Sequence, residues 1–155
     1  MEFRIVDFEL LTRHYITYQN GVQEIEDVKK KFIDKVEPFR KEMQNVILST
    51  QGGLIVDNLS QQERSERFQK LQQEALEVDR EAKIKLKEMG QDLNEKVYSE
   101  LELIISNWSI ENSIDVVLGK LEVVYLNEKF EATNDILEVL KEKNLWCEEL
   151  QEESV

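Results

Sequence analysis

The chain has 155 residues, 34% of them charged, and a formal net charge of −13 at pH 7. One proline and five glycines suit long helices and argue against a disordered chain or an all-β fold. No apolar run approaches the roughly 20 residues that a membrane-spanning helix needs. No basic stripe is concentrated enough to bind nucleic acid or an anionic membrane. The N-terminus as written shows no signal peptide, which predicts a cytoplasmic protein.

The first residues predict a small structured region before the long helices. The segment Phe3-Arg4-Ile5-Val6 is mainly apolar and β-branched, which is typical of a short buried strand. Asp7 can cap a short helix that runs from Phe8 to about Tyr15. Asn20-Gly21 interrupts the pattern, so we expect the first long helix to begin after it.

Two long amphipathic helices are predicted between residues 20 and 107. Apolar residues recur at steps of three or four, which gives each helix one narrow apolar seam, as in a coiled coil. The seam positions are Val22, Ile25, Val28, Phe32, Val36, Phe39, Met43 and Val46 in the first helix, and Phe68, Leu71, Ala75, Val78, Ala82, Leu86, Met89, Leu93, Val97 and Leu101 in the second. We therefore expect the two helices to fold back on each other as an antiparallel hairpin, here called the arm.

Local signals predict the tip of this hairpin at residues 50–59, around Gly52-Gly53. Ser60 and Glu63 then match a capping box, in which each side chain accepts a hydrogen bond from the other residue's backbone N–H. The second helix should start there and run to about Asn107. Pro38, inside the first helix, removes one backbone hydrogen bond and predicts a kink. That kink can be a hinge or a static bend.

Two β-rich runs near the C-terminus predict a β-hairpin, with strands at residues 114–118 and 121–125 around a glycine-containing turn. Thr133 can cap a final helix, whose predicted apolar face is Ile136, Leu137 and Leu140. Residues 145–155 carry four glutamates and are expected to form an acidic tail that frays.

These elements predict an α+β fold that is mostly α, with a long antiparallel helical hairpin on a small β body. The body is predicted at residues 1–19 and 108–144, the arm at 20–107 and the tail at 145–155. Three short strands cannot close a core alone, and two helices with a single seam bury little area. We therefore expect self-association to complete the body. The apolar residues expected there are Ile5, Val116, Leu118, Val123 and Tyr125.

The negative charge is concentrated in the C-terminal part of the chain. Residues 20–49 carry six acidic and six basic side chains, which cancel. Residues 109–155 carry twelve acidic and four basic side chains, a net charge of −8. The predicted arm is therefore nearly neutral, and the acidity belongs to the region after it.

The order and spacing of several segments resemble the Skp/OmpH family of chaperones. These segments are the opening Phe3-Arg4-Ile5-Val6-Asp7, the helix start Leu59-Ser60-Gln61-Gln62-Glu63-Arg64, and the ending Ile114-Asp115-Val116-Val117-Leu118, Val123-Val124-Tyr125 and Thr133-Asn134-Asp135-Ile136-Leu137. The resemblance covers about residues 3–144. It implies a homotrimer with a small β-barrel body and three arms, which holds unfolded client proteins without ATP. It also implies a periplasmic location if an upstream signal has been removed. The family's arms are markedly basic, and this chain departs from that pattern.

The resemblance implies that clients occupy a cavity between the arms, so apolar side chains off the seam are candidates for client contact. Seam residues are expected to pack between the helices instead. The predicted client-binding residues are Ile33, Ile47 and Ile84 on the helices and Leu54, Ile55 and Val56 at the tip, where consecutive apolar residues are unusual.

A binding function is favoured over an enzymatic one. His14 is the only histidine and Cys147 the only cysteine, and the two make no metal or nucleophile constellation. We therefore expect no catalytic residue, metal or other cofactor. The leading hypothesis is an ATP-independent holdase for unfolded or partly folded proteins. The alternative is a coiled-coil scaffold or assembly factor that binds one folded partner, which a single saturable partner would favour.

Overall fold

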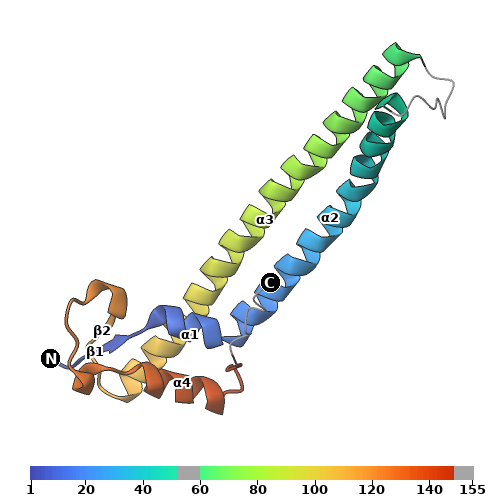
Figure 1. Ribbon diagram of the computed structural model, residues 1–155. Coiled ribbons are helices and arrows are strands. Elements are labelled where there is room, and N and C mark those ends of the chain that lie inside the picture. The colour runs from blue at the N-terminus through green and yellow to red at the C-terminus, as the bar shows by residue number, and fades with distance from the viewer. Residues whose placement is uncertain (52–59, 149–155) are drawn as a thin grey trace. The chain divides into compact units, whose positions relative to one another are not determined.

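The computed structural model describes residues 1–51 and 60–148, and these are mostly helical (Figure 1). The elements in chain order are β1 (Phe3–Val6), α1 (Phe8–His14), α2 (Ile16–Gln51), α3 (Gln61–Glu111), β2 (Val116–Gly119), the short 3-10 helices η1 (Lys120–Glu122) and η2 (Glu128–Phe130), and α4 (Thr133–Glu142). The predicted fold class is confirmed, since two long helices form a hairpin and the strands are a small pair.

The chain divides into two compact units. The body unit contains Met1–Gln23 and Gln91–Val155, and the arm unit contains Glu24–Gly90. Residues 52–59 of the tip predicted at 50–59, and residues 149–155 of the predicted tail, lie outside the described residues.

The sheet of the body unit is a parallel pair, not a hairpin. β1 pairs with β2 so that Phe3 lies opposite Val116 and Val6 opposite Gly119. The predicted strand at residues 121–125 is wrong, because the chain enters η1 directly after β2 and residues 123–127 form no strand. Parallel strands need a long crossover, and the helices between β1 and β2 supply it. The strand that pairs with β2 is therefore β1, from the N-terminal end of the chain, and not the segment that follows β2 in the sequence.

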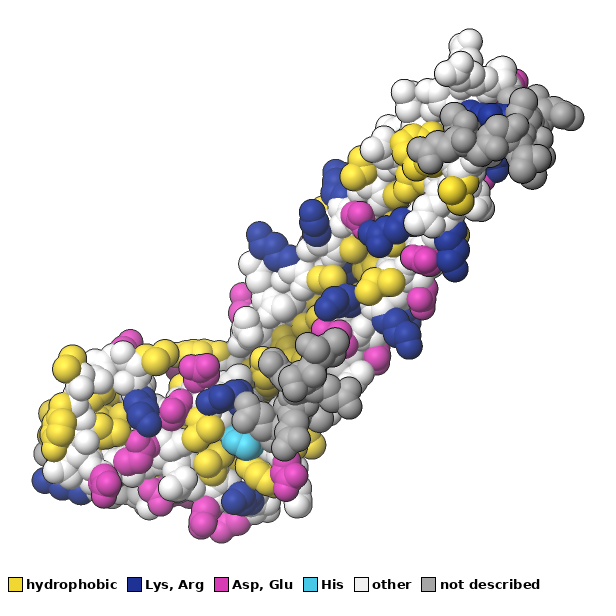
Figure 2. All heavy atoms as spheres, viewed as in Figure 1, with side chains coloured by type: hydrophobic (Ala, Val, Ile, Leu, Met, Phe, Trp, Pro, Cys, Tyr) yellow, Lys and Arg dark blue, Asp and Glu magenta, His cyan; other side chains and the backbone are white. Residues whose placement is uncertain are grey.

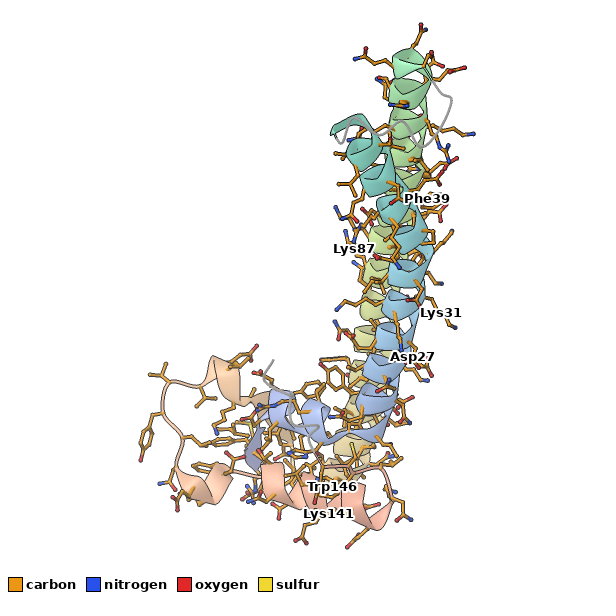
Figure 3. All side chains as sticks on the ribbon, turned by 45° about the vertical axis from the view of Figure 1, so that its right-hand side comes forward. Asp27, Lys31, Phe39, Lys87, Lys141 and Trp146 are labelled. Atoms are coloured by element: carbon orange, nitrogen blue, oxygen red, sulfur yellow. The ribbon has the colours of Figure 1, made fainter. Side chains whose placement is uncertain are left out.

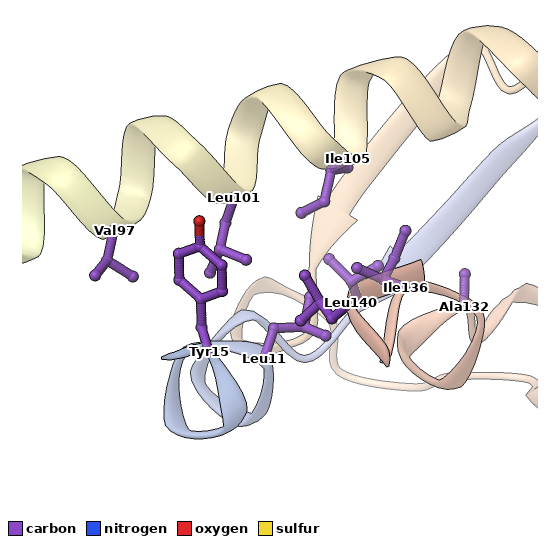
Figure 4. Close-up of a cluster of buried hydrophobic side chains, with 9 residues drawn as sticks. Leu11, Tyr15, Val97, Leu101, Ile105, Ala132, Ile136 and Leu140 are labelled. Atoms are coloured by element: carbon purple, nitrogen blue, oxygen red, sulfur yellow. The ribbon is translucent and has the colours of Figure 1, made fainter. Parts of the chain in front are cut away.

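The core of the body unit lies between α1, α3 and α4 (Figure 4). The largest fully buried side chains are Leu11, Val97, Leu101, Ile136 and Leu140. Because each of these three helices contributes an apolar face, the core holds side chains that are enclosed on all sides. The predicted apolar face of the last helix is confirmed, since Ile136 and Leu140 are fully buried and Leu137 packs against the same core.

Caps fix where α1 and α4 begin. The Asp7 side chain accepts a hydrogen bond from the backbone N–H of Leu10 at 3.0 Å, as predicted for a cap of α1. The prediction that Thr133 caps α4 is wrong, because Ala132 holds the capping position and Thr133 is the first helical residue. The Thr133 hydroxyl instead accepts a hydrogen bond from the backbone N–H of Asp7 at 2.8 Å, which ties the starts of the two helices together.

The first long helix begins earlier than predicted. α2 starts at Ile16 and continues through Asn20-Gly21. A Cβ on Gly21 would lie 2.2 Å from Cδ1 of Leu93, so the missing side chain allows α3 to pack closely here. A glycine inside a helix costs about 1 kcal/mol relative to alanine, and the close packing offsets that cost. Gly21 therefore does not break the helix as predicted, but is the position where α2 and α3 come into close contact.

The arm unit is held by one seam between α2 and α3, as predicted. Val36, Ala75 and Val78 are buried there, and Phe32, Phe39 and Met43 pack against them. Exposed ion pairs join the two helices beside the seam, among them Lys35–Glu81 at 3.2 Å and Arg67–Glu42. Exposed ion pairs contribute at most about 1 kcal/mol each, so the apolar seam dominates the stability of the arm.

The predicted capping box is present at the start of α3. The backbone N–H of Ser60 donates to Oε2 of Glu63 at 2.7 Å, and the N–H of Glu63 donates to Oγ of Ser60 at 3.2 Å. In the other helix, α2 continues through Pro38. Because proline has no N–H, the carbonyl of Asp34 cannot receive the usual helical hydrogen bond from it.

Candidate binding surfaces

The arm unit exposes large apolar side chains outside its seam. Of the predicted client-binding residues, Ile33, Ile47 and Ile84 are exposed by 50%, 42% and 51%. Leu48 and Leu76 are also exposed, and neither was predicted. The other predicted residues, Leu54, Ile55 and Val56, lie outside the described residues. The arm therefore presents apolar area that its own core does not use.

Helical spacing groups most of these residues on one side of the hairpin. Each residue turns a helix by about 100°, so Ile33 and Leu48 both lie on the same flank of the seam residue Val36. Leu76 directly follows the seam residue Ala75, and in an antiparallel pair this places it on the matching flank. Ile84 lies nine residues after Ala75, about two and a half turns, so it points away from the seam. Ile33, Leu48 and Leu76 thus lie on one flank of the hairpin, whereas Ile84 lies away from both the seam and this flank.

Charged side chains surround these apolar residues. Figure 2 shows hydrophobic, basic and acidic side chains interspersed over the visible face of the arm. Lys31, Asp27 and Lys87, labelled in Figure 3, project from the two helices as part of this mixed surface. Scattered charge of both signs keeps a surface soluble while apolar side chains remain accessible.

The body unit has an open sheet edge. β1 is flanked by β2 on one side and by a bridge from Ile5 to Glu131 on the other. The outer edge of β2 pairs with no other strand among the described residues. Val116 and Leu118 project from this strand and are about two-fifths exposed, at 38% and 41%. Open edges of this kind are templates for pairing with another chain.

A cleft of about 710 Å³ lies beside this edge, between α3 and the segment from β2 to η1. Its apolar lining includes Tyr98, Ile105, Ile110, Val116 and Leu121. Acidic residues also line it, namely Asp7, Glu9, Glu102, Asp115 and Glu122, with one lysine, Lys120. The body therefore combines an unpaired strand edge with an apolar hollow.

The residues that we predicted to form the self-associating body differ in their exposure to solvent. Ile5 is 3% exposed and is already buried within the chain, whereas Tyr125 is 80% exposed. Val123 is half-buried. Tyr125 lies in the segment predicted as a strand and found without one, so it projects from irregular chain.

Sequence reasoning missed a polar contact at the base of α2. The Tyr15 hydroxyl donates to Oε2 of Glu100 at 2.5 Å, and the Thr17 hydroxyl donates to the same oxygen at 2.9 Å. Burial, followed by the hydrogen bond to Glu100, raises the pKa of Tyr15. Figure 4 shows the Tyr15 ring between α1 and α3, near Val97 and Leu101. The sequence signal that could have indicated this contact is Glu100 itself, a charged residue directly before the buried Leu101 of α3.

The described residues contain no group of three metal-ligand side chains that could hold an ion. Burial raises the pKa of the Cys147 thiol, and a protonated thiol is a poor nucleophile. His14 stacks on Trp146 and hydrogen-bonds to the backbone carbonyl of Cys147. Within the same residues, no helix is long and apolar enough to cross a membrane.

These features define a class of protein with a helical hairpin held by a single seam, an apolar flank on that hairpin, and a small body whose sheet edge is unpaired among the described residues. The family model for outer membrane protein (OmpH-like) matches residues 2–140. The chain belongs to the OmpH-like family.

A solved structure supports the same fold. The chain is similar to a putative outer membrane chaperone (OmpH-like) from Caulobacter crescentus, with 16% sequence identity and a TM-score of 0.66. The match covers 91% of this chain and 84% of the other. A search of curated proteins found no match.

Proposed function

We propose that the protein is an ATP-independent holdase that binds unfolded or partly folded proteins between the arms of a homotrimer. Family membership supports a chaperone function. The observation that carries the finer proposal is the set of exposed apolar side chains on the arm, which the seam does not use. We also place its action in the periplasm, in line with the outer membrane description of the family.

The proposed mode of binding is many weak contacts instead of one tight site. Ile33, Ile47, Leu48 and Leu76 are exposed apolar residues of the arm. Charged side chains of both signs lie among hydrophobic ones over its visible face (Figure 2). Each contact buries little area, but several arms around one client add their contacts, because the second and later contacts are effectively intramolecular. Such a surface suits non-native chains of many sequences. The predicted tip residues Leu54, Ile55 and Val56 belong to the same proposal.

The proposed homotrimer rests on the body. The open edge of β2 and the adjacent cleft would be covered by neighbouring copies, and so would Tyr125 and Leu121, which are 80% and 90% exposed. Exposed apolar area of this kind is costly in water and marks an interaction surface. In the trimer, strands from three copies would complete one sheet.

Pro38 is proposed as a hinge that lets the arm adapt to clients of different sizes. It lies on an exposed position of α2, where its missing N–H weakens the helix. Spin labels at the exposed residue Gln62 near the tip would report distances between arms. Replacing Pro38 with alanine should narrow the distance distribution, whereas unchanged widths would support a static bend.

The holdase proposal is tested by light scattering with an aggregating client. The wild-type protein should suppress aggregation at one trimer per client, and the double variant Ile33→Ser, Ile84→Ser should suppress it less. The control is Leu103→Ser, at an exposed apolar residue of the body unit, which should behave as wild type. No suppression by the wild-type protein contradicts the proposal.

A second assay separates holding from scaffolding. The holdase should bind several unrelated unfolded chains and release them on refolding. Saturable binding of one folded partner at a fixed ratio, with none to unfolded chains, would support the coiled-coil scaffold instead.

A further inference from the structure

The corner between α1 and α2 leaves backbone groups in need of partners. α1 ends at His14, Tyr15 has an extended backbone with φ −84° and ψ 125°, and α2 begins at Ile16. At such a break, the last carbonyls of one helix and the first N–H groups of the next have no partner within their helices. Something outside the two helices has to satisfy them.

Residues 144–148, here called the clasp, supply those partners. The backbone N–H of Ile16 donates to the carbonyl of Leu145 at 2.8 Å, and the N–H of Cys147 donates to the carbonyl of His14 at 2.9 Å. These two hydrogen bonds form an antiparallel bridge between Tyr15 and Trp146. The clasp therefore pairs with the corner as a short strand would.

A turn after α4 directs the clasp to this position. Asn144 has a positive φ of 55°, a backbone conformation that asparagine tolerates better than most residues. The N–H of Leu145 then donates to the carbonyl of Leu140 at 2.8 Å, which closes the end of α4.

Side chains reinforce the backbone pairing. The His14 and Trp146 rings stack with centroids 5.7 Å apart and planes 9° from parallel. The Lys141 ammonium lies 5.0 Å from the centre of the Trp146 ring, and Figure 3 shows the two side chains near the end of α4. On another side of the corner, Glu100 accepts hydrogen bonds from Tyr15 and Thr17. The corner is thus held by α3 and by the clasp.

We propose that the clasp is a conformational lock that keeps the α1–α2 corner closed. The family model ends at residue 140, so this lock lies beyond the part of the chain that the model matches. The proposal is independent of the holdase function, since it concerns local opening of the corner and not client contact.

Hydrogen exchange of backbone amides, measured on the full chain by mass spectrometry, tests the lock. Cys147→Pro removes the N–H that donates to His14, and Cys147→Ser is the matched control that keeps it. The proline variant should exchange about tenfold faster at residues 14–23, because these amides exchange through local opening of the corner. The serine variant should exchange as wild type.

Two shortened chains provide a second comparison. A chain ending at Lys143 lacks the clasp and should show the same faster exchange at residues 14–23. A chain ending at Glu148 retains the clasp and should match wild type. Peptides around Leu101, in the core of the body unit, should be unaffected in all four variants. Unchanged exchange at the corner would overturn the lock, and so would faster exchange throughout the body, which would make the clasp a general part of the core.

Discussion

The body unit and the arm unit bury their apolar side chains to different degrees. In the body, Leu11, Leu101, Ile136 and Leu140 have no exposed surface, because helices enclose them on several sides. In the arm, the buried cluster holds only two valines and an alanine, Val36, Val78 and Ala75. A hairpin with one seam leaves most of each helix in solvent. The arm therefore buries fewer apolar side chains than the body and leaves others exposed, as the proposed client binding would require.

The largest expected effect is a loss of stability when a buried apolar residue of α3 is truncated, compared with an exposed one. Leu101→Ala should lower the free energy of unfolding of the body by about 2–5 kcal/mol, because it leaves a cavity in a fully packed core. Leu103→Ala, at a position 62% exposed, should change it by less than about 0.5 kcal/mol. Urea titrations followed by circular dichroism, at one protein concentration, measure both. Similar losses in the two variants would contradict the burial assigned to Leu101.

Truncating a buried side chain of the seam should lower the stability of the arm alone. Val36→Ala removes the most buried side chain of the seam and should cost about 2 kcal/mol. Amides of residues 28–44 should exchange faster while those of the body stay protected. Ile33→Ala, one turn away at an exposed position, is the control and should leave exchange nearly unchanged. Equal loss of protection in both units would show that they unfold as one.

The contact between Tyr15 and Glu100 makes the body sensitive to high pH. Tyr15→Phe should cost about 1.5 kcal/mol at neutral pH, the order expected for a hydrogen bond to a charged group. Because burial raises the pKa of Tyr15 in the folded state, its stabilising contribution is complete below the ordinary pKa of tyrosine. The contribution is lost as the pH rises through the raised value.

Thermal melts across this alkaline range measure the effect. The wild-type protein should lose stability more steeply than the Tyr15→Phe variant. Parallel pH profiles would contradict the assigned hydrogen bond.

The smallest expected effect concerns the cap at the far end of the arm. Ser60→Ala should lower the local stability of the start of α3 by about 1 kcal/mol. Hydrogen bonding from the Ser60 backbone, then from its side chain, lowers the pKa of Glu63. The contribution of this glutamate is therefore present above the ordinary pKa of a glutamate and is lost as the pH falls through the lowered value.

Amide exchange of residues 61–68, measured by nuclear magnetic resonance at neutral pH, tests the cap, and the Glu63 carboxyl titration tests the shift. Ser65→Ala is the control, since Ser65 is exposed inside the helix and alanine is the better helix former there. Destabilisation of the same size in both variants would contradict the capping box.

Features with local causes could be predicted from the sequence. The seam of the arm follows from steps of three and four residues, and the capping box follows from Ser60 and Glu63 alone. The cap at Asp7 has the same local origin. Each depends on residues less than about two turns apart, where spacing determines geometry.

Features that depend on distant partners could not be predicted in this way. The helix break expected at Gly21 is overridden by Leu93, which packs against the space that the missing side chain leaves. β2 pairs with β1 more than 100 residues away, as the register of Phe3 with Val116 shows, and the expected hairpin fails for that reason. The clasp depends on residues that are far apart in the sequence, such as Ile16 and Leu145, which are 129 positions apart. Sequence pattern carries little information on contacts at such separations.

Native mass spectrometry of the protein mixed with an unfolded client tests the central claim most directly, because it reports assembly and holding in one spectrum. We expect a homotrimer, with a second species in which one trimer carries one client chain. The double variant Ile33→Ser, Ile84→Ser should keep the trimer and lose most of the client-bound species. A monomer, or a trimer that carries no unfolded chain, would contradict the proposed function.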